Sequence, residues 1–177
     1  MSVSFTISGH SSGGTMASAH AIAFSDRVGG LGHYMAAPFG CSRLINLTSE
    51  DYNERCSNST ASSDMLAYVY DSFSRRRIAD PANLRDTPVF VYAGGDDSIV
   101  DPDVGKTAAS LYTQLLANVS FFMLPGAEHA FAIDSSCATL CPRCSLPNQK
   151  SHVAPLRPCP PHSYASVGAR PATIATT

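Results

Sequence analysis

Near the start of the chain, apolar residues are spaced as in a strand over residues 3–8 and as in a helix over residues 15–24. Residues 3–8 form a short apolar run, which predicts a strand. A helix is predicted over residues 15–24, and a second buried strand over residues 31–37, a short apolar run bounded by glycines and a proline. The apolar stripe of that helix comprises Met16, Ala19, Ala23 and Phe24.

The middle of the chain is polar before helical spacing returns. Residues 39–63 are rich in Ser, Asn and Thr and predict a surface excursion, which we expect a Cys41–Cys56 disulfide to close. Residues 64–73 then carry apolar side chains at four-residue steps, which predicts a helix with one apolar face. These side chains are Met65, Val69 and Phe73.

Two further strands and one helix complete the periodic part of the chain. Residues 87–93 are almost continuously apolar, as is typical of a strand buried on both faces of a parallel sheet. Asp101 and Pro102 predict the start of a helix, and residues 119–124 predict the next strand. Strands that alternate with helices over short connections indicate a parallel α/β sheet flanked by helices.

Composition changes after Cys137, where prolines become frequent and neither helical nor strand spacing persists. We therefore expect an α/β domain over residues 1–137 and an irregular or disordered tail over residues 138–177. The net charge of −2 predicts no electrostatic surface for nucleic acid, and no apolar stretch approaches the length that spans a bilayer. The oligomeric state is left open.

A Gly-x-Ser-x-Gly motif, formed by Gly9, Ser11 and Gly13, lies between the first predicted strand and helix. This order is the nucleophile elbow of α/β-hydrolases, in which a sharp turn exposes the serine. We expect the two glycines to let neighbouring backbone pass closely. The helix that follows directs N–H groups, including that of Ser12, toward a developing oxyanion.

A serine hydrolase of this kind needs a carboxylate and then a histidine, each after a later strand. Asp97 follows the strand at 87–93, and His129 follows the strand at 119–124. The adjacent Asp96 is an alternative acid, or both could be ordinary turn carboxylates. Of the other histidines, His10 is interpreted as a spacer within the elbow, and His20 and His33 as helix or strand-end residues.

Several features favour a secreted glycoprotein. Three Asn-x-Ser/Thr sequons begin at Asn46, Asn58 and Asn118, and six cysteines suit an oxidising compartment. No signal peptide is visible in this chain, so its leader would lie outside it.

Four segments resemble extracellular poly(3-hydroxybutyrate) depolymerases, especially the fungal type: residues 3–17, 37–41, 93–100 and 126–131. The resemblance implies Ser11 as nucleophile, Asp97 rather than Asp96 as acid, and His129 as base. It also implies short hydroxyalkanoate polyesters or small esters as substrates. The family has cysteines near the positions of Cys41 and Cys56, which fits the expected disulfide. Such a site needs no cofactor and no metal, because the triad and backbone donors suffice.

The fungal enzymes are circularly permuted, which would explain an elbow at the start of the chain. After Cys137 the resemblance fails, and the family's later strands, second oxyanion donor and tryptophan are not recognisable. We therefore expect a truncated chain, a partial α/β-hydrolase fold and poor catalysis.

Two alternatives remain open. Cys141 and Cys144, together with Cys159 and His162, have the spacing of zinc ligands and would make the tail a small binding module. The chain could also be an inactive esterase homologue.

Overall fold

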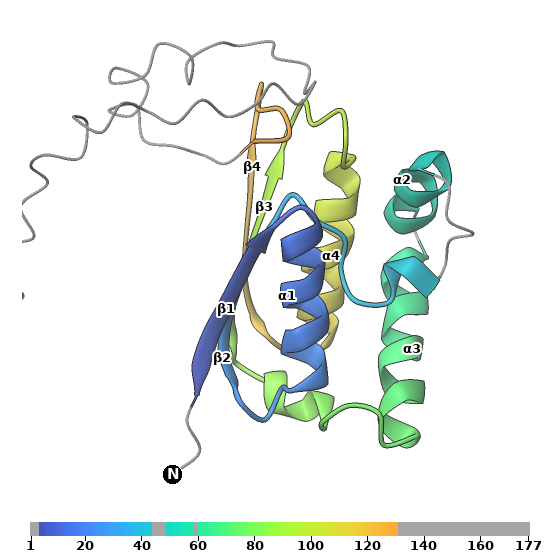
Figure 1. The fold of residues 1–177 in the computed structure, drawn as a ribbon, viewed down its shortest axis with the longest axis vertical. Helices are drawn as coiled ribbons and strands as arrows, with labels where there is room; N and C mark the ends of the chain where they lie inside the picture. The colour runs from blue at the N-terminus through green and yellow to red at the C-terminus, as the bar shows by residue number, and fades with distance from the viewer. Residues whose placement is uncertain (1–3, 44–48, 59, 131–177) are drawn as a thin grey trace, which may run out of the picture. The chain divides into compact units, whose positions relative to one another are not determined.

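The computed structural model describes residues 4–43, 49–58 and 60–130, and within residues 49–52 the backbone alone (Figure 1). The chain divides into two units, residues 1–131 and 132–177, and all the described residues belong to the first. The predicted tail over residues 138–177 lies outside the described residues. Four strands make one sheet: β1 (Phe5–His10), β2 (Val28–Tyr34), β3 (Pro88–Gly94) and β4 (Asn118–Leu124).

All four strands are parallel, and their order in the sheet is the order of the chain. The helices are α1 (Ser12–Ala23), α2 (Ser49–Ser57), α3 (Ala61–Ser74) and α4 (Pro102–Gln114), with short 3₁₀ turns at Cys41–Arg43 and Pro81–Leu84. This confirms the predicted α/β class, a parallel sheet flanked by helices.

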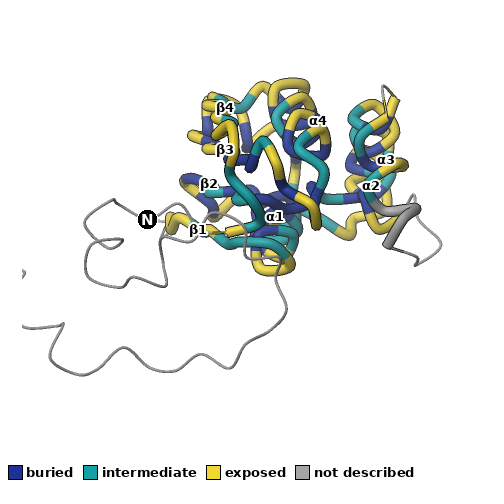
Figure 2. The backbone as a smooth tube through the Cα atoms, turned by 90° about the horizontal axis from the view of Figure 1, so that it is seen from above, coloured by how far each residue is buried: buried dark blue, intermediate teal, exposed yellow. Residues whose placement is uncertain are grey.

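The helices lie on one face of the sheet (Figures 1 and 2). Crossovers between parallel strands are right-handed, so strands added in one direction place every crossover helix on the same face. Helix α1 packs on β1 and β2, α4 packs on β3 and β4, and α2 and α3 pack against α4 from outside. The core lies between these layers and includes Ile22, Leu31, Val91, Val104 and Leu111.

The opposite face of the sheet is open in the part of the chain that the structure describes. Thr6 and Ser8 of β1, Phe90 of β3 and Ser120 of β4 are exposed there. None of the helices in the described ranges is long and apolar enough to cross a membrane.

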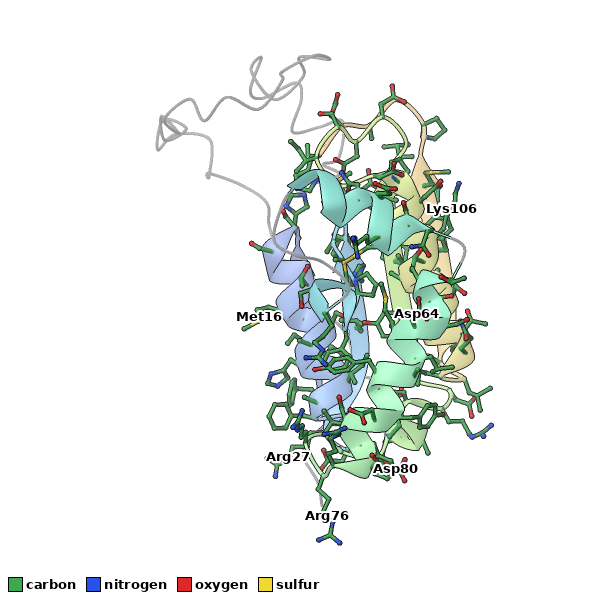
Figure 3. The ribbon with its side chains drawn as sticks, turned by 90° about the vertical axis from the view of Figure 1, so that its right-hand side faces the viewer. Met16, Arg27, Asp64, Arg76, Asp80 and Lys106 are labelled. Carbon is green, nitrogen blue, oxygen red and sulfur yellow. A yellow bond between two sulfur atoms is a disulfide. The ribbon has the colours of Figure 1, made fainter. Side chains whose placement is uncertain are left out.

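Helix α1 confirms the predicted helix but buries a different face. Met16, predicted in the apolar stripe, is 71% exposed and points outward (Figure 3), and Phe24 is also exposed. The buried side is formed instead by small residues and one isoleucine: Gly14, Ala17, Ser18, Ala21 and Ile22. Small side chains let the helix approach the sheet closely. The prediction missed this face because it followed the spacing of apolar residues such as Met16 and Phe24.

The second strand also differs from its prediction, since it spans Val28–Tyr34 rather than residues 31–37. Gly29 and Gly30, taken as boundaries, lie inside the strand. A β-carbon at Gly29 would lie 2.2 Å from Oγ of Ser4. The chain turns sharply at Met35, whose φ is 45°, and leaves the sheet.

The predicted excursion over residues 39–63 contains helix α2, which sequence analysis missed because the segment is polar. The predicted disulfide is confirmed: Cys41 bonds to Cys56, which lies on α2, and both residues are fully buried. The two ends of the excursion are therefore joined at the edge of the core.

Candidate active site

Ser11 occupies the turn between β1 and α1 in a conformation that few residues adopt. Its φ is 56° and its ψ is −127°, outside both helix and strand regions. The Ser11 N–H donates to the carbonyl of Tyr34 at 3.0 Å, and its own carbonyl accepts from the N–H of Thr15. These bonds hold Ser11 at the carboxyl end of β1, in the strained turn typical of a nucleophile elbow.

The glycines around Ser11 differ in how strictly the packing requires them. A β-carbon at Gly9 would lie 2.2 Å from the carbonyl oxygen of Gly13, and one at Gly14 would lie 2.6 Å from Cβ of Ala36. A β-carbon at Gly13 would meet nothing within 4 Å. Close packing therefore requires Gly9 and Gly14, and the expectation that Gly13 itself needs the room is wrong.

The amino end of α1 presents backbone donors beside the serine. Ser12 is the first residue of the helix, so its N–H has no acceptor within that helix. The positive end of the helix dipole lies at the same place. A negatively charged oxygen bound there would be stabilised, as the sequence predicts for an oxyanion site.

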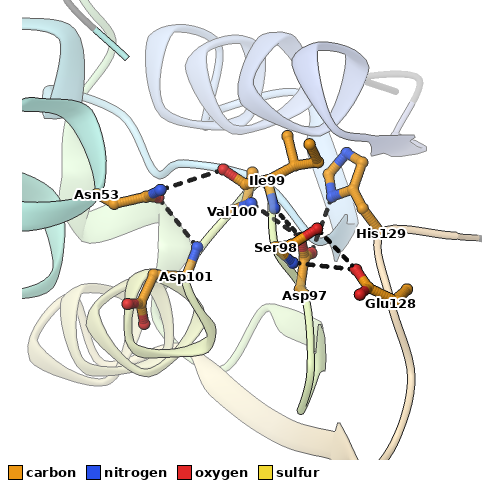
Figure 4. A network of polar contacts seen from close by, with 8 residues as sticks. All are labelled: Asn53, Asp97, Ser98, Ile99, Val100, Asp101, Glu128 and His129. Carbon is orange, nitrogen blue, oxygen red and sulfur yellow. Dashed lines mark hydrogen bonds and ion pairs between the residues drawn. The ribbon is translucent and has the colours of Figure 1, made fainter. Parts of the chain in front are cut away.

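Asp97 lies in the turn after β3 and is 7% exposed. Its Oδ1 accepts hydrogen bonds from the N–H groups of Ile99 and Val100, both at 2.9 Å (Figure 4). Its Oδ2 lies 2.8 Å from Nδ1 of His129. Both oxygens of this carboxylate therefore have fixed partners.

His129 lies in the segment after β4, and Asp97 orients its ring through Nδ1. When that nitrogen carries the proton, Nε2 of the neutral ring is the acceptor. Among the described residues, Nε2 is buried without a hydrogen-bond partner, and no hydrogen bond joins it to Ser11. The structure thus pairs Asp97 with Nδ1 of His129, and Nε2 is the ring nitrogen without a hydrogen-bond partner among the described residues.

Glu128 links the His129 segment to the turn that carries Asp97. Its Oε2 accepts from the N–H of Ser98 at 3.1 Å and from the Ser98 hydroxyl at 3.0 Å (Figure 4). These hydrogen bonds lower the pKa of Glu128 and favour its charged form. Sequence reasoning missed this link, because nothing in the chain indicates that Glu128 and Ser98 meet.

The other titratable candidates separate clearly in the structure. Asp96 is exposed, and His33 is fully buried within β2. The ring of His10, interpreted as a spacer, lies 4.7 Å from the ring of His129. Burial and the nearby His129 lower the pKa of His10, and Asp97 opposes this shift. His10 therefore lies beside the candidate base, which its position in the motif did not indicate.

Of the three sequon asparagines, Asn58 and Asn118 are exposed, and Asn46 lies outside the described residues. The zinc candidates Cys141, Cys144, Cys159 and His162 also lie outside the described residues. In the ranges that the structure describes, no three metal-ligating side chains gather.

Comparison with known proteins gives two similar relatives. The polyhydroxybutyrate depolymerase of Talaromyces funiculosus is 35% identical over 137 residues, covering 74% of this chain and 38% of the relative. The poly(3-hydroxybutyrate) depolymerase of Delftia acidovorans is 31% identical over 145 residues, covering 76% of this chain and 28% of the relative. No family model matches the chain.

Two solved structures are also similar. Arabidopsis thaliana SOBER1 has 19% identity and a TM-score of 0.45, covering 72% of this chain and 45% of that one. A fungal esterase of Rhizomucor miehei has 16% identity and a TM-score of 0.42, covering 71% and 42%. The chain is thus similar over most of its length to polyhydroxybutyrate depolymerases, and it spans less than half the length of these curated relatives.

Proposed function

We propose that this chain carries the catalytic core of a serine ester hydrolase, with Ser11 as nucleophile, His129 as base and Asp97 as the acid of the triad. The observation that supports it best is the bond between Nδ1 of His129 and the buried carboxylate of Asp97, at 2.8 Å. The elbow conformation of Ser11 is independent support, because such a turn exposes a nucleophile.

The proposed reaction follows from these groups. His129 accepts the hydroxyl proton of Ser11 through Nε2 as Oγ attacks the ester carbonyl, and Asp97 stabilises the imidazolium that forms. The N–H of Ser12 donates to the oxyanion of the tetrahedral intermediate. His129 then gives the proton to the departing alcohol, which leaves an acyl-Ser11 ester. His129 next takes a proton from water as the water attacks this ester, and it returns the proton to Oγ of Ser11 as the carboxylic acid is released.

Hydroxyalkanoate polyesters are the proposed substrates, because both curated relatives are named as depolymerases of polyhydroxybutyrate. Small soluble esters of similar acyl groups would share the chemistry. An extracellular site of action fits the buried Cys41–Cys56 disulfide, since disulfides persist in oxidising compartments.

The direct test is covalent labelling. A fluorophosphonate probe should label the chain once, at Ser11, and the chain should hydrolyse a short p-nitrophenyl ester. Ser11→Ala should abolish both signals, whereas Ser42→Ala, a change at an exposed serine, should leave both intact. Labelling that persists in folded Ser11→Ala would contradict the assignment.

A further inference from the structure

Helix α2 carries none of the proposed triad, yet one of its side chains contacts the turn that holds Asp97. The side-chain amide nitrogen of Asn53 donates to the carbonyl of Ile99 at 3.2 Å (Figure 4). Its Oδ1 accepts from the N–H of Asp101 at 3.0 Å. One amide group therefore spans this turn with both its donor and its acceptor.

The first of these contacts acts on a group that binds Asp97. The carbonyl of Ile99 and the N–H of Val100 belong to one rigid peptide unit. Asn53 donates to the carbonyl oxygen of that peptide unit. The Val100 N–H of the same unit donates to Oδ1 of Asp97 at 2.9 Å. Hydrogen bonds linked in this way orient and strengthen one another. Asn53 is thus one peptide group away from the candidate acid.

Other contacts hold parts of this turn: Val100 is buried in the core, and Glu128 binds the N–H and hydroxyl of Ser98. Ile99 itself is 50% exposed, so the carbonyl side of the Ile99–Val100 peptide unit is less firmly packed than its Val100 side. Without Asn53, water would compete for the Ile99 carbonyl and the unit could rotate. The Val100 N–H would then turn away from Asp97, and the carboxylate would lose one of its two backbone donors.

Asn53 lies close to the disulfide along α2. It precedes Cys56 by three residues on α2, a spacing that places both side chains on neighbouring positions of one helix face. Cys56 is fully buried and bonded to Cys41, in the 3₁₀ turn that lies beyond the end of β2. The disulfide therefore ties α2 to the turn at Cys41 about one helical turn away from Asn53.

We propose that Asn53 is a positioning residue that orients Asp97, and through it His129, and that the Cys41–Cys56 disulfide keeps Asn53 in place. The inference rests on the proposed function, since its purpose is the geometry of the triad. The competing explanation is structural: Asn53 could only support the start of α4, through its bond to the N–H of Asp101.

Asn53→Asp separates these explanations. It keeps an acceptor for the Asp101 N–H but replaces the donor to the Ile99 carbonyl by a carboxylate oxygen, which that carbonyl repels. We expect kcat to fall about tenfold, as for the loss of one hydrogen bond, with KM little changed and a thermal midpoint above that of Asn53→Ala, because the bond to the Asp101 N–H is retained. Asn53→Ala should lower both kcat and thermal stability. Glu54→Ala, a change at the neighbouring exposed residue, is the matched control and should change neither. A folded Asn53→Asp variant with the parent kcat would overturn the inference.

A second measurement does not depend on activity. The proton on Nδ1 of His129 should give a low-field proton NMR resonance because it is shared with Asp97, and His129→Gln should remove it. We expect this resonance to shift and to exchange faster with water in Asn53→Asp and not in Glu54→Ala. If it depends on Asn53 in a parent that hydrolyses no ester, the positioning inference stands and the proposed function fails. If it is unchanged in both Asn53 variants, the positioning inference fails.

The role of the disulfide is tested by a double-mutant cycle. Replacing both Cys41 and Cys56 by Ser should lower kcat in the parent but add little to the loss in Asn53→Ala, measured where circular dichroism shows every variant folded. Such non-additivity is the mark of two changes that act through one contact. Losses that simply multiply would show that the disulfide does not act through Asn53.

Discussion

Nδ1 of His129 lies 2.8 Å from Oδ2 of Asp97, although 32 positions separate the two residues in the chain. They meet because β3 and β4 are parallel neighbours, so the segments that follow the two strands leave the sheet at one edge. The side chain of Asp97 is 1% exposed and that of His129 is 12% exposed. Little water reaches this pair, so the carboxylate acts on the imidazole with little screening.

Asp97→Asn should lower kcat by about 10⁴, the loss seen when a triad histidine is held in the wrong tautomer. Asp96→Asn should cost less than tenfold, because Asp96 is exposed and, of these two adjacent carboxylates, Asp97 is the one that binds His129. Steady-state hydrolysis of a short p-nitrophenyl ester measures both. The opposite ranking would move the acid to Asp96.

Ser11→Ala and His129→Ala should each remove nearly all activity, and the double variant should lose little more than either. The reason is that the nucleophile and its base act as one unit. Initial rates of the three variants, with folding checked by circular dichroism, test this. Multiplicative losses would mean that Ser11 and His129 do not share a step.

Sequence order was sufficient to predict the elements that carry the triad candidates. The apolar run at 87–93 appears in the structure as β3, but the expectation that both faces of this strand are buried is wrong among the described residues, because Pro88 and Phe90 are exposed on the open face. The helix predicted to start at Asp101 and Pro102 appears as α4, with a buried face that includes Val104 and Leu111. The cap at Asp101 was also predictable, and its side chain accepts from the N–H of Asp103. Local chemistry of this kind is readable from neighbouring residues alone.

The supports of the site were not predictable, since they join segments far apart in the chain. Asn53 lies in a polar stretch with no apolar period, and its partners are 46 and 48 residues away. Glu128 contacts Ser98 across 30 residues. Such contacts depend on the register of neighbouring strands and on helix placement, which no periodicity records.

Gly9→Ala and Gly14→Ala should each disrupt the elbow, whereas Gly13→Ala should be tolerated. The added methyl groups would overlap backbone at Gly9, and both Ala36 and the Gly9 carbonyl at Gly14, but would meet nothing at Gly13. We expect losses of several kcal/mol in the first two variants and less than about 1 kcal/mol in the third. Urea unfolding measures these differences. Equal stability of Gly9→Ala and Gly13→Ala would contradict the close approach.

Removing the disulfide by Cys41→Ser and Cys56→Ser should lower the free energy of unfolding by about 3 kcal/mol. The bond closes a loop with a sequence separation of 15, and restricting that loop reduces the entropy of the unfolded chain. Thermal unfolding of oxidised, reduced and variant protein gives the measurement. Identical midpoints for the oxidised parent and the variant would show that the loop is ordered without the bond.

A buried histidine outside the site should control acid stability. His33 lies in β2 with its ring edge-on to Tyr112 at 6.2 Å, and it is fully buried. Burial lowers the pKa of His33 from 6.5 to about 4, because the charged imidazolium is poorly solvated there. The folded protein therefore resists a proton that the unfolded chain accepts.

The sign of the effect follows from this difference. Above pH 6.5 His33 is neutral in both states and does not favour unfolding, and between pH 6.5 and 4 only the unfolded chain binds the proton. Stability should therefore fall as pH decreases, by about 2 kcal/mol at pH 5 from this residue alone. Urea unfolding at pH 7.5 and at pH 5 measures this fall in the free energy of unfolding. The fall should be about 2 kcal/mol smaller in His33→Leu than in the parent, and in His20→Gln it should equal that of the parent. If His33→Leu and the parent lose equal stability between these pH values, another group is responsible for the acid sensitivity.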